Sequence, residues 1–393
     1  MKQFLIFVFQ AFYFIIANLI DDGFANKMSI DVVVAYGSYI PITWTILSFY
    51  NIGKYAYTNT QKEPKTCMAL GFIISILTSI FLLIFGSFIH NIFNLSATQI
   101  DIFNKLIFAY AFTLPLRQVG DFLSLYLMYQ LKNKQVIIGD IIYWIVALSL
   151  DVYVFLSGMK AWGLVVTTGI AYVFYDIYLL WKTNILKEKI NKEFIKIAFL
   201  KGKDIVIDRL CGKVATLAYG SMASQLPENL YAIHCVAYGV CTNCEEFTSN
   251  YNIFSIAKLK NETEKLRQKG LKLIKKYGVI LIPIEYIFSF IFLIIYHGKV
   301  DFLTCIPWML LYMTDSLSML FYAEMKAVLS CYSKTEYLRY GGFIGIAIRI
   351  PFTFLMWKLG FGLIGFAIAC TIDFLLRGIY FFIMAGKYEK TTR

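Results

Sequence analysis

Twelve apolar segments of membrane-spanning length limit most strongly what this chain of 393 residues can fold into. A helix of roughly 20 residues crosses the hydrocarbon core of a bilayer, where lipid offers the backbone no hydrogen-bond partner. The chain is 59% hydrophobic and only 16% charged, whereas soluble chains carry about a quarter charged residues. The sequence therefore predicts an all-α integral membrane protein. The predicted spans are residues 3–25, 30–53, 67–90, 103–130, 135–157, 162–181, 204–223, 229–256, 273–296, 302–330, 337–357 and 361–385.

Basic residues collect on alternate connections between these spans. The two chain ends and the connections after spans 2, 4, 6, 8 and 10 hold 26 of the 37 lysines and arginines, while the opposite connections hold five. Because positive connections stay on the cytoplasmic side, we predict two cytoplasmic termini in a bacterial-type cytoplasmic membrane. This placement explains the net charge of +12 without a nucleic-acid partner.

Two sequence patterns recur at offsets of 199 and 197 residues. WGLVVTTGIAY at 162–172 matches FGLIGFAIACT at 361–371, and VVVAYGSYIP at 32–41 matches NLYAIHCVAY at 229–238. Each match joins one span to the span six further on, which predicts two pseudo-symmetric six-helix lobes around a central cavity. The predicted domains are an N-lobe at 1–182, a cytoplasmic linker at 183–203 and a C-lobe at 204–393.

Three carboxyl groups inside the predicted spans lack a basic residue one helical turn away, namely Asp21, Asp151 and Asp315. Each lies 17 to 19 residues from the nearest cytoplasmic charge, so we expect all three at one depth, in the outer half of the cavity. A charge at bilayer depth is costly and indicates a functional site by default. These groups could exchange protons or bind Na⁺, and the sequence leaves both ions open.

Other polar side chains in the spans have weaker claims to function. Three pairs of opposite charge are expected to neutralise each other locally, namely Asp208 with Arg209, Arg117 with Asp121 and Asp373 with Arg377. Glu245 and Glu246 have no adjacent base and could line the second-lobe cavity. Tyr36 and Tyr143 are candidates for the substrate cavity because they lie near Asp21 and Asp151 in depth or lobe.

A Cys-x-x-Cys pair, Cys241 and Cys244, follows His234 and Cys235 by about two helical turns. A structural zinc site needs four ligands, and the sequence has no second pair of this kind. Cysteines in apolar spans behave as small hydrophobic residues. We therefore predict no metal site.

Several segments resemble the multidrug and toxic compound extrusion (MATE) family, within the multidrug/oligosaccharidyl-lipid/polysaccharide (MOP) exporter superfamily. NLIDDGFANKMSIDVVVAYG at 18–37 resembles the first-span segment, with Asp21 at the family's Asp, and SLDVYVF at 149–155 places Asp151 on the fifth-span Asp. TDSLSMLFYAEMK at 314–326 resembles the tenth span of the norfloxacin-extruding branch. The start of the second lobe and the last two spans are matched by LPENLYAIHCVAYG at 226–239 and RIPFTFLMWKLGFGLIGFAIA at 349–369.

The resemblance implies a secondary active antiporter that uses H⁺ or Na⁺ to export organic, cationic or amphipathic compounds by alternating access. It implies ion coupling at Asp21 and Asp151, and coupling or substrate contact at Asp315. We expect a monomer that binds a small-molecule or peptide substrate and membrane lipids, with no cofactor besides the coupling ion and no enzymatic activity. The family's fifth-span Asn is Ala147 here, so the polar network around the acids should be thinner.

Two alternatives stay open. On the same scaffold the chain could be a flippase for a lipid-linked precursor, whose phosphate would bind the basic connections and cavity lysines such as Lys213. A remote alternative is an intramembrane prenyl- or phosphatidyl-transferase, because NLIDDGFAN at 18–26 faintly resembles an acidic metal-binding motif. That chemistry needs several carboxylates on neighbouring turns to hold Mg²⁺, and a second acidic cluster is missing.

Overall fold

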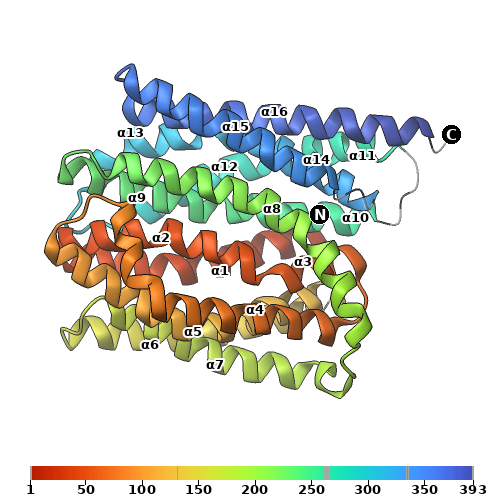
Figure 1. Ribbon diagram of the computed structural model, residues 1–393, viewed down its shortest axis with the longest axis horizontal. Helices are drawn as coiled ribbons and strands as arrows, with labels where there is room; N and C mark the ends of the chain where they lie inside the picture. The colour runs from red at the N-terminus through yellow and green to blue at the C-terminus, as the bar shows by residue number, and fades with distance from the viewer. Residues whose placement is uncertain are drawn as a thin grey trace.

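The computed structural model describes residues 2–130, 132–260, 262, 265–332, 334 and 336–391, which form helices and no strand (Figure 1). The first half contains α1 (Lys2–Met28), α2 (Ile30–Tyr50), α3 (Ile52–Thr60), α4 (Pro64–Phe85), η1 (Gly86–Ile92), α5 (Ala97–Tyr129), α6 (Asn133–Leu156) and α7 (Trp162–Lys182). The second half contains η2 (Ile185–Lys187), α8 (Lys192–Ala223), α9 (Glu228–Cys244), α10 (Glu246–Leu259), α11 (Leu266–Leu273), η3 (Ile274–Gly278), α12 (Val279–Ile295), α13 (Phe302–Tyr312), η4 (Met313–Asp315), α14 (Ser316–Cys331), α15 (Glu336–Lys358) and α16 (Gly362–Thr391).

The two halves of the chain lie one above the other in Figure 1, with α1 to α7 below and α8 to α16 largely above. They meet where α8 packs on α2 and α3, where α9 packs on α2, and where α1 packs on α9 and α10. The helices that carry the repeated patterns hold equivalent places, since α2 and α9 are second and α7 and α16 last in each half. The carboxyl terminus and the connections at 61–63 and 183–191 mark what we call the basic end, and 157–161 and 224–227 mark the opposite end.

Every predicted span coincides with a helix or with consecutive helices, and local capping explains several starts. The span predicted at 103–130 begins earlier, as α5, because Ser96 and Gln99 form a capping box. The Ser96 amide donates to Oε1 of Gln99 at 3.0 Å, and the Gln99 amide donates to Oγ of Ser96 at 3.4 Å. Ser29 caps α2 by accepting a bond from the Val32 amide at 3.2 Å.

Three predicted spans contain a break, and the break in the tenth span bears on function. Residues Met313–Asp315 form a tight turn between α13 and α14. The hydroxyl of Tyr286 on α12 donates to the Met313 carbonyl oxygen at 3.0 Å. In a regular helix this carbonyl would accept a backbone hydrogen bond, so Tyr286 gives it a partner from another helix. The other breaks lie at Asn51, after α2, and at Glu245, after α9.

Seven helical segments among the described residues are long and apolar enough to cross a membrane by length and composition. These segments are Ile30–Tyr50, Pro64–Ile92, Asn133–Leu156, Trp162–Lys182, Leu266–Ile295, Glu336–Lys358 and Gly362–Glu389. The five predicted spans outside this set correspond to α1, α5, α8, α9 with α10, and α13 with α14. Most of the charged residues inside the bundle lie on these helices, which lowers their mean hydropathy. Two of the five spans are also divided into shorter helices. Length and hydropathy therefore identify these spans less well.

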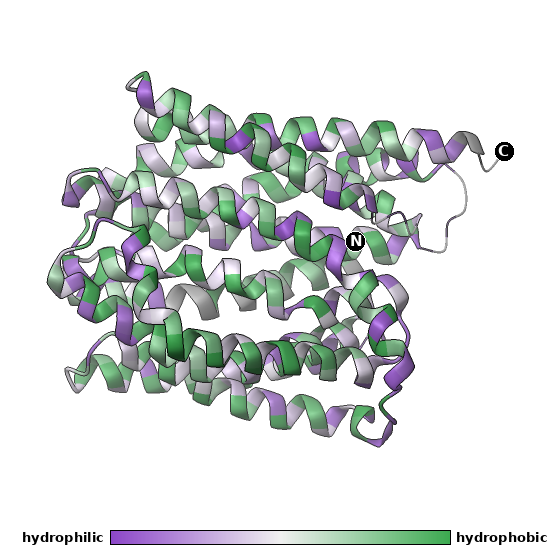
Figure 2. Cartoon of the chain, viewed as in Figure 1, coloured by the Kyte–Doolittle hydropathy of each residue, from purple (hydrophilic) through white to green (hydrophobic). Residues whose placement is uncertain are grey.

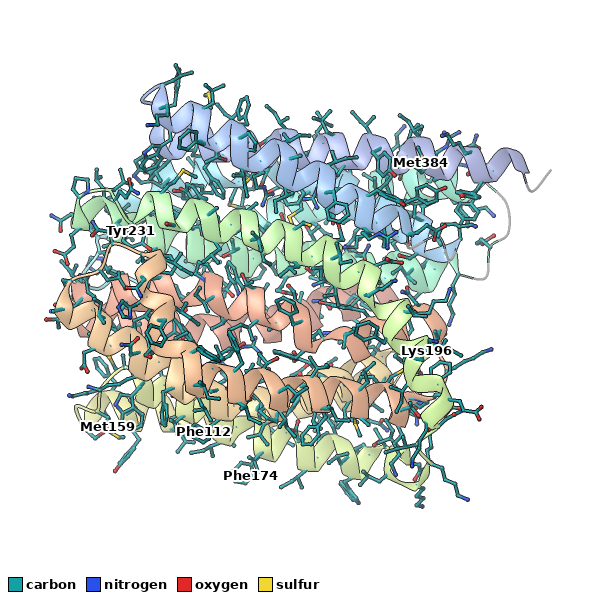
Figure 3. All side chains as sticks on the ribbon, in the orientation of Figure 1. Phe112, Met159, Phe174, Lys196, Tyr231 and Met384 are labelled. Atoms are coloured by element: carbon teal, nitrogen blue, oxygen red, sulfur yellow. The ribbon has the colours of Figure 1, made fainter. Side chains whose placement is uncertain are left out.

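Hydrophobic residues recur along the helices in Figure 2, and many of the large ones are exposed. Phe112 on α5 and Phe174 on α7 are labelled in Figure 3, and both side chains are exposed. Leu77 and Phe81 on α4 show the same pattern, with Ser75 and Ser79 turned inward. This inverts the arrangement of a soluble bundle and matches a surface in contact with lipid.

Glycines let some helices approach closely, and Gly53 is the tightest case. A Cβ atom on Gly53 of α3 would lie 2.0 Å from the Cys67 carbonyl oxygen of α4. We therefore expect Gly53→Ala to destabilise the protein by about 1–3 kcal/mol, as overpacking does. Gly212→Ala on α8 is the matched control, because its Cβ would meet nothing within 4 Å. Thermal unfolding in mild detergent measures both, and equal midpoints would contradict the expectation.

Candidate functional site

Asp21 on α1 and Asp151 on α6 form a buried carboxyl pair near the opposite end of the first half. Their carboxyl groups lie within hydrogen-bonding range of each other. Thr168 on α7 donates to Oδ2 of Asp21 at 2.8 Å, and the neighbouring Thr167 donates to Oδ1 of Asp151. The side chains are 8% and 0% exposed respectively. The structure thus brings together two residues that the sequence singled out separately.

Two threonines and a tyrosine complete this site. Thr167 and Thr168 follow each other on α7, so their hydroxyls reach the two carboxyls from one turn of helix. The hydroxyl of Tyr143, one of the candidates from sequence, lies near Thr168 and the carboxyl pair. Tyr36 on α2 is buried near Asp21. Ala147, which replaces the expected Asn, adds only a methyl group between Tyr143 and Asp151 on α6.

The carboxyl pair needs a positive partner that the described side chains do not supply. In the described ranges, neither Asp21 nor Asp151 forms an ion pair with a lysine or arginine. Two carboxylates in contact out of water repel each other strongly, so a proton or a cation must lie between them. The oxygen donors of both carboxyls and both threonines suit H⁺ or Na⁺ equally well.

A central cavity of about 340 Å³ lies between the two halves of the chain. Asp315, Glu245, Glu246 and Tyr143 are on its wall, as the sequence analysis expected for the cavity candidates. The expectation that Asp21 and Asp151 would also lie in this cavity is wrong, because both sit behind its wall among α1, α6 and α7. The two acids are level with each other along their helices, since their carboxyl groups meet, but neither side chain lines the cavity.

Tyr36 likewise lies outside the central cavity. It lines a small separate pocket with Asp22, Asn26 and Tyr296 near the opposite end. Asp22 accepts a bond from Asn243 on α9 at 3.0 Å and so joins α1 to the second half. Tyr36 therefore stands between the carboxyl pair and the contact of the two halves.

Asp315 stands at the break between α13 and α14, where the turn presents its carboxyl to the cavity. Its charged neighbours include Glu245, Arg349 and Glu285. Glu285 on α12 is a polar residue that the sequence analysis missed, although it is the only acid in a very apolar helix. It is buried and accepts a hydrogen bond from Thr248 on α10 at 2.6 Å.

The charges of the cavity wall are of both signs. Among the described residues that line it, seven are basic and six are acidic. The basic set is Lys54, Arg117, Arg209, Lys213, Lys326, Arg349 and Arg377, and the acidic set is Asp121, Asp140, Asp208, Glu245, Glu246 and Asp315. The cavity is therefore not predominantly acidic.

Asp208 is not paired with Arg209, contrary to the sequence prediction. It contacts Lys326 of α14 and lies 3.5 Å from Nη1 of Arg377 on α16. Arg209 instead lies over the ring of Tyr55, with 5.0 Å between the guanidinium carbon and the ring centroid. Adjacent residues on a helix point in different directions, so proximity in sequence did not make them partners.

Of the two remaining predicted pairs, one is present and one is not. Asp373 and Arg377 form an ion pair at 2.7 Å, as predicted, and Asp373 also holds Arg349 at 2.9 Å. Within the described part of the chain, Arg117 forms no ion pair with Asp121, and its buried Nε has no hydrogen-bond partner. Asp121 instead accepts a long bond of 3.5 Å from Tyr172.

Hydrogen bonds join the two halves at both ends of the bundle. At the basic end, Asn59 donates to the Lys201 carbonyl oxygen at 2.6 Å and Lys260 donates to Gln61 at 3.3 Å, and both contacts are exposed.

At the opposite end the bonds are more buried. Gln99 at the start of α5 donates to Asp31 of α2 at 3.0 Å and to Glu228 of α9 at 2.6 Å. Ser38 of α2 and Tyr231 of α9 share a hydrogen bond of 2.8 Å. The cavity itself reaches Met128, the last residue but one of α5, at the basic end.

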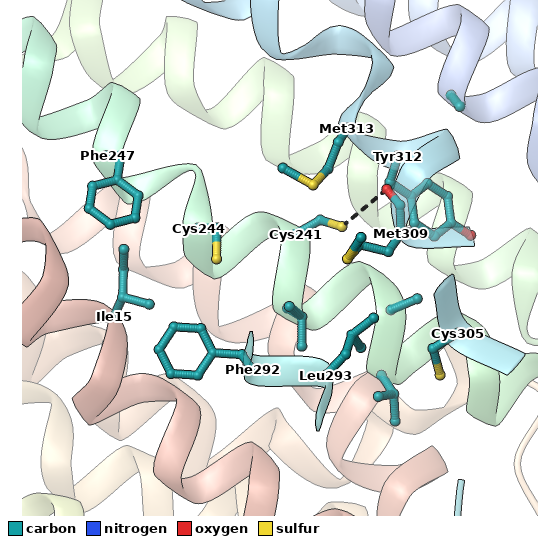
Figure 4. Close-up of a cluster of buried hydrophobic side chains, with 14 of the residues drawn as sticks. Ile15, Cys241, Cys244, Phe247, Phe292, Leu293, Cys305, Met309, Tyr312 and Met313 are labelled. Atoms are coloured by element: carbon teal, nitrogen blue, oxygen red, sulfur yellow. Dashed lines mark hydrogen bonds between the residues drawn. The ribbon is translucent and has the colours of Figure 1, made fainter. Parts of the chain in front are cut away.

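The cysteine pair lies in an apolar cluster. Cys241 and Cys244 pack beside Phe292, Met309 and Ile15, and the thiol of Cys241 points to the Met309 carbonyl oxygen at 3.6 Å (Figure 4). The ring of His234 hydrogen-bonds to Tyr312 at 2.7 Å. In the ranges that the structure describes, no three His, Cys, Asp or Glu side chains gather closely enough to hold a metal ion.

Comparison with solved structures identifies the class of fold. No protein-family model and no curated protein matches the sequence. An inward-facing MATE family transporter of the MOP superfamily superposes with a TM-score of 0.75 at 12% identity, over 96% of this chain and 94% of that one. A substituted form of the Vibrio cholerae MATE transporter VcmN gives 0.77 at 10% identity, over 99% of this chain and 96% of that one.

A third structure is a MOP superfamily transporter from Pyrococcus furiosus, for which reversed polarity of the binding pocket suggests a different function. Its TM-score is 0.76 at 11% identity, over 98% of this chain and 96% of that one. The chain therefore has the MATE transporter fold, two six-helix lobes around a central cavity, which confirms the fold predicted from sequence. At these identities the likeness concerns the fold, and function must be argued from the site.

Proposed function

We propose that this chain is a secondary active transporter that exports an amphipathic organic compound in exchange for H⁺ or Na⁺. The observation that carries the proposal is the Asp21–Asp151 pair. Two buried carboxyl groups in contact, with hydroxyls around them and no basic partner among the described residues, form a site that is incomplete without a cation. Its place beside the contact between the halves suits a site whose occupancy biases their arrangement.

Coupling requires that the site bind its cation with different affinity in two states of the transporter. In the arrangement described above, part-buried and buried hydrogen bonds among α2, α5 and α9 join the halves at the opposite end. The exposed contact of Lys260 with Gln61 joins them at the basic end, and the cavity lies toward that end. With the basic end cytoplasmic, this arrangement is the inward-facing one. A cation entering from outside reaches the pair five to seven residues from the ends of α1 and α6, and its binding favours the return to the inward-facing arrangement.

The rest of the proposal follows from the same geometry. The lobes, 1–182 and 204–393, rock about the cavity, with the linker at 183–203 between them. Both termini face the cytoplasm, the membrane is a bacterial-type cytoplasmic membrane, and one chain suffices. Asp315 contacts the substrate or a second cation, since it is the acid that the helix break presents to the cavity.

A second function is favoured by the basic residues on the cavity wall. A flippase for a lipid-linked precursor would use such residues to hold a phosphate group while the lipid chains stay in the bilayer. Four of the seven basic side chains in the cavity, Lys54, Arg117, Arg209 and Lys213, form no ion pair in the described ranges. Both functions use the same cavity and differ in whether a cation gradient drives transport.

The test uses cells that lack their own efflux pumps and express the full chain. Cells loaded with a lipophilic cationic dye or a lipophilic anionic dye are given an imposed H⁺ or Na⁺ gradient, and efflux is followed by fluorescence. We expect efflux of at least one dye to follow one of the two gradients. Lipid translocation in proteoliposomes without a gradient would favour the flippase instead. Membrane-inserted protein with neither activity would contradict the proposed function.

A further inference from the structure

We propose that the central cavity is an anion site, built to hold the phosphate, diphosphate or carboxylate group of an amphipathic substrate. The ligands are four side chains that we call the cavity cations, namely Lys54, Arg117, Arg209 and Lys213. The proposal rests on the proposed function, because it names the substrate class of the same cavity. It departs from the cationic cargo that the resemblance to the MATE family implies.

The cavity cations differ from the other basic residues of the wall in lacking a carboxylate partner. Lys326, Arg349 and Arg377 are each held in ion pairs with Asp208 or Asp373. No ion pair of the described residues includes a cavity cation. Lys54, Arg117 and Lys213 are half-buried and Arg209 is exposed, so their charged groups stay accessible from the cavity. Four unpaired charges of one sign around one cavity attract a ligand of the opposite charge.

Their positions bring donors from both halves to one place. Lys54 on α3 and Arg117 on α5 belong to the first half, while Arg209 and Lys213 lie one turn apart on α8 of the second half. Gly202 allows this approach, because a Cβ atom there would lie 2.5 Å from the Ile52 carbonyl oxygen of α3. An anion bound here bridges the two halves and is released when they separate.

The donors of the cavity cations are free to bind an anion. The buried Nε of Arg117 has no hydrogen-bond partner. The Arg209 guanidinium lies over Tyr55, and Nζ of Lys213 lies 4.4 Å from the centroid of the Trp44 ring. Contacts with ring faces orient a cation while leaving its N–H groups available. Guanidinium and ammonium groups placed in this way form strong charge-assisted hydrogen bonds to phosphate or carboxylate oxygens.

Acids also face the cavity cations and set the balance of charge. Asp121 and Glu246 are acidic neighbours of Lys54, and Glu245 is a neighbour of both Lys213 and Arg349. Asp140 is engaged by Tyr175, whose hydroxyl donates to it at 2.9 Å. These acids do not form ion pairs with the cavity cations, so they lower the positive potential of the site without occupying its donors.

The surroundings of the cavity cations point to an amphipathic substrate and not to a bare ion. Aromatic side chains line the cavity beside them, namely Trp44, Tyr55, Tyr143, Tyr172, Tyr238 and Phe366. A volume of about 340 Å³ falls in the range of small-molecule pockets. Apolar contact would hold the body of the substrate while the cavity cations hold its charged group.

Equilibrium binding to the purified full chain in lipid nanodiscs tests the proposal. The probes are tritiated farnesyl diphosphate as amphipathic anion, tritiated tetraphenylphosphonium as amphipathic cation, and unlabelled inorganic diphosphate as competitor. We expect farnesyl diphosphate to bind more tightly than tetraphenylphosphonium. Arg209→Gln and Lys54→Gln should each weaken its binding by about tenfold or more, the effect of losing a charge-assisted bond.

Lys196→Gln is the matched control, since Lys196 is an exposed lysine of the same helix α8 that points away from the cavity (Figure 3). Its binding of farnesyl diphosphate should equal that of the wild type. Competition by inorganic diphosphate at similar concentration would assign the site to a free anion, which keeps the chemistry but removes the amphipathic body. Two different variants are used so that a folding defect in one, seen as a lowered unfolding midpoint, leaves the other informative.

Two outcomes would overturn the anion site. One is tighter binding of tetraphenylphosphonium than of farnesyl diphosphate. The other is unchanged anion binding in both Arg209→Gln and Lys54→Gln. Because binding is measured without a gradient, these outcomes are independent of whether transport is coupled to H⁺ or Na⁺. Gradient-driven efflux of a cationic dye together with a failed anion site would leave the proposed function standing.

Discussion

Replacing Asp21 with Asn is expected to abolish gradient-driven transport, with a fall of about 100-fold in the initial rate, near the upper end of coupling effects. The amide has the size of the carboxyl and can still accept the bond from Thr168. It cannot take up a proton or bind a cation as a carboxylate does. The change therefore removes the coupling site and preserves its packing. Substrate efflux under an imposed H⁺ or Na⁺ gradient measures the effect.

Asp176→Asn is the matched control for this prediction. Asp176 is another buried acid of the first half. It lies on α7, two turns from Thr168, and is not part of the carboxyl pair. Its amide variant should keep gradient-driven transport within a few-fold of the wild type. If Asp176→Asn lost transport to the same extent, the first half would be sensitive to any loss of charge, and the coupling role of Asp21 would fail.

A double substitution separates one shared site from two independent ones. Asp21 and Asp151 are in contact, and residues that share one site couple strongly when both are changed. The combination Asp21→Asn with Asp151→Asn should therefore be no worse than either single change. Losses that multiply would mean that the two acids bind separate cations.

Much of the fold could be predicted because it depends on local features. The apolar segments locate the twelve predicted spans, each of which coincides with one helix or with consecutive helices, and Ser29 and Ser96 mark where α2 and α5 begin. The breaks could not be predicted, because they depend on neighbours in space. The turn at Met313 is supported by Tyr286 from another helix, and no Gly or Pro within Met313–Asp315 reveals it.

The candidate site could be predicted only in part, for a geometric reason. Counting residues placed Asp21 and Asp151 level with each other, as their contact requires. It could not give the direction in which each side chain points around its helix. The contact between them, and their place behind the cavity wall, follow from how α1, α6 and α7 pack. Thr167 and Thr168 gave no signal of their own, since hydroxyl residues are common in membrane helices and usually bond to the preceding turn.

The ionic pairs show the same limit in a sharper form. Asp373 and Arg377 could be paired from sequence because residues four apart on a helix share a face. Asp208 meets Lys326 and Arg377, which lie 118 and 169 residues away, so only the packed bundle identifies its partners. The sequence analysis assigned Arg209 to a local pair with Asp208. The packing instead leaves Arg209 on the cavity wall without an ion pair among the described residues.

Replacing Asp373 with Asn is expected to destabilise the second half by about 3–5 kcal/mol, the effect of breaking a buried ion pair. Asp373 is 1% exposed in its side chain and holds Arg377 at 2.7 Å and Arg349 at 2.9 Å. Without the charge of Asp373, the buried guanidinium groups of Arg349 on α15 and Arg377 on α16 lose their shared carboxylate. Among the described residues, Arg377 then keeps only its ion pair with Asp208. The midpoint of thermal unfolding in mild detergent should fall accordingly.

Glu336→Gln is the control, because it removes a carboxylate from the exposed ion pair that Glu336, the first residue of α15, forms with Lys334. Glu336 lies 4.0 Å from Lys334, and both side chains are about 40% exposed, so we expect a change of about 0–1 kcal/mol. Adding Arg349→Leu to Asp373→Asn should restore part of the lost stability, since it removes one of the two uncompensated charges. A double variant less stable than Asp373→Asn would show that Arg349 stabilises the fold through its contact with the Phe374 ring more than it costs as an unpaired charge.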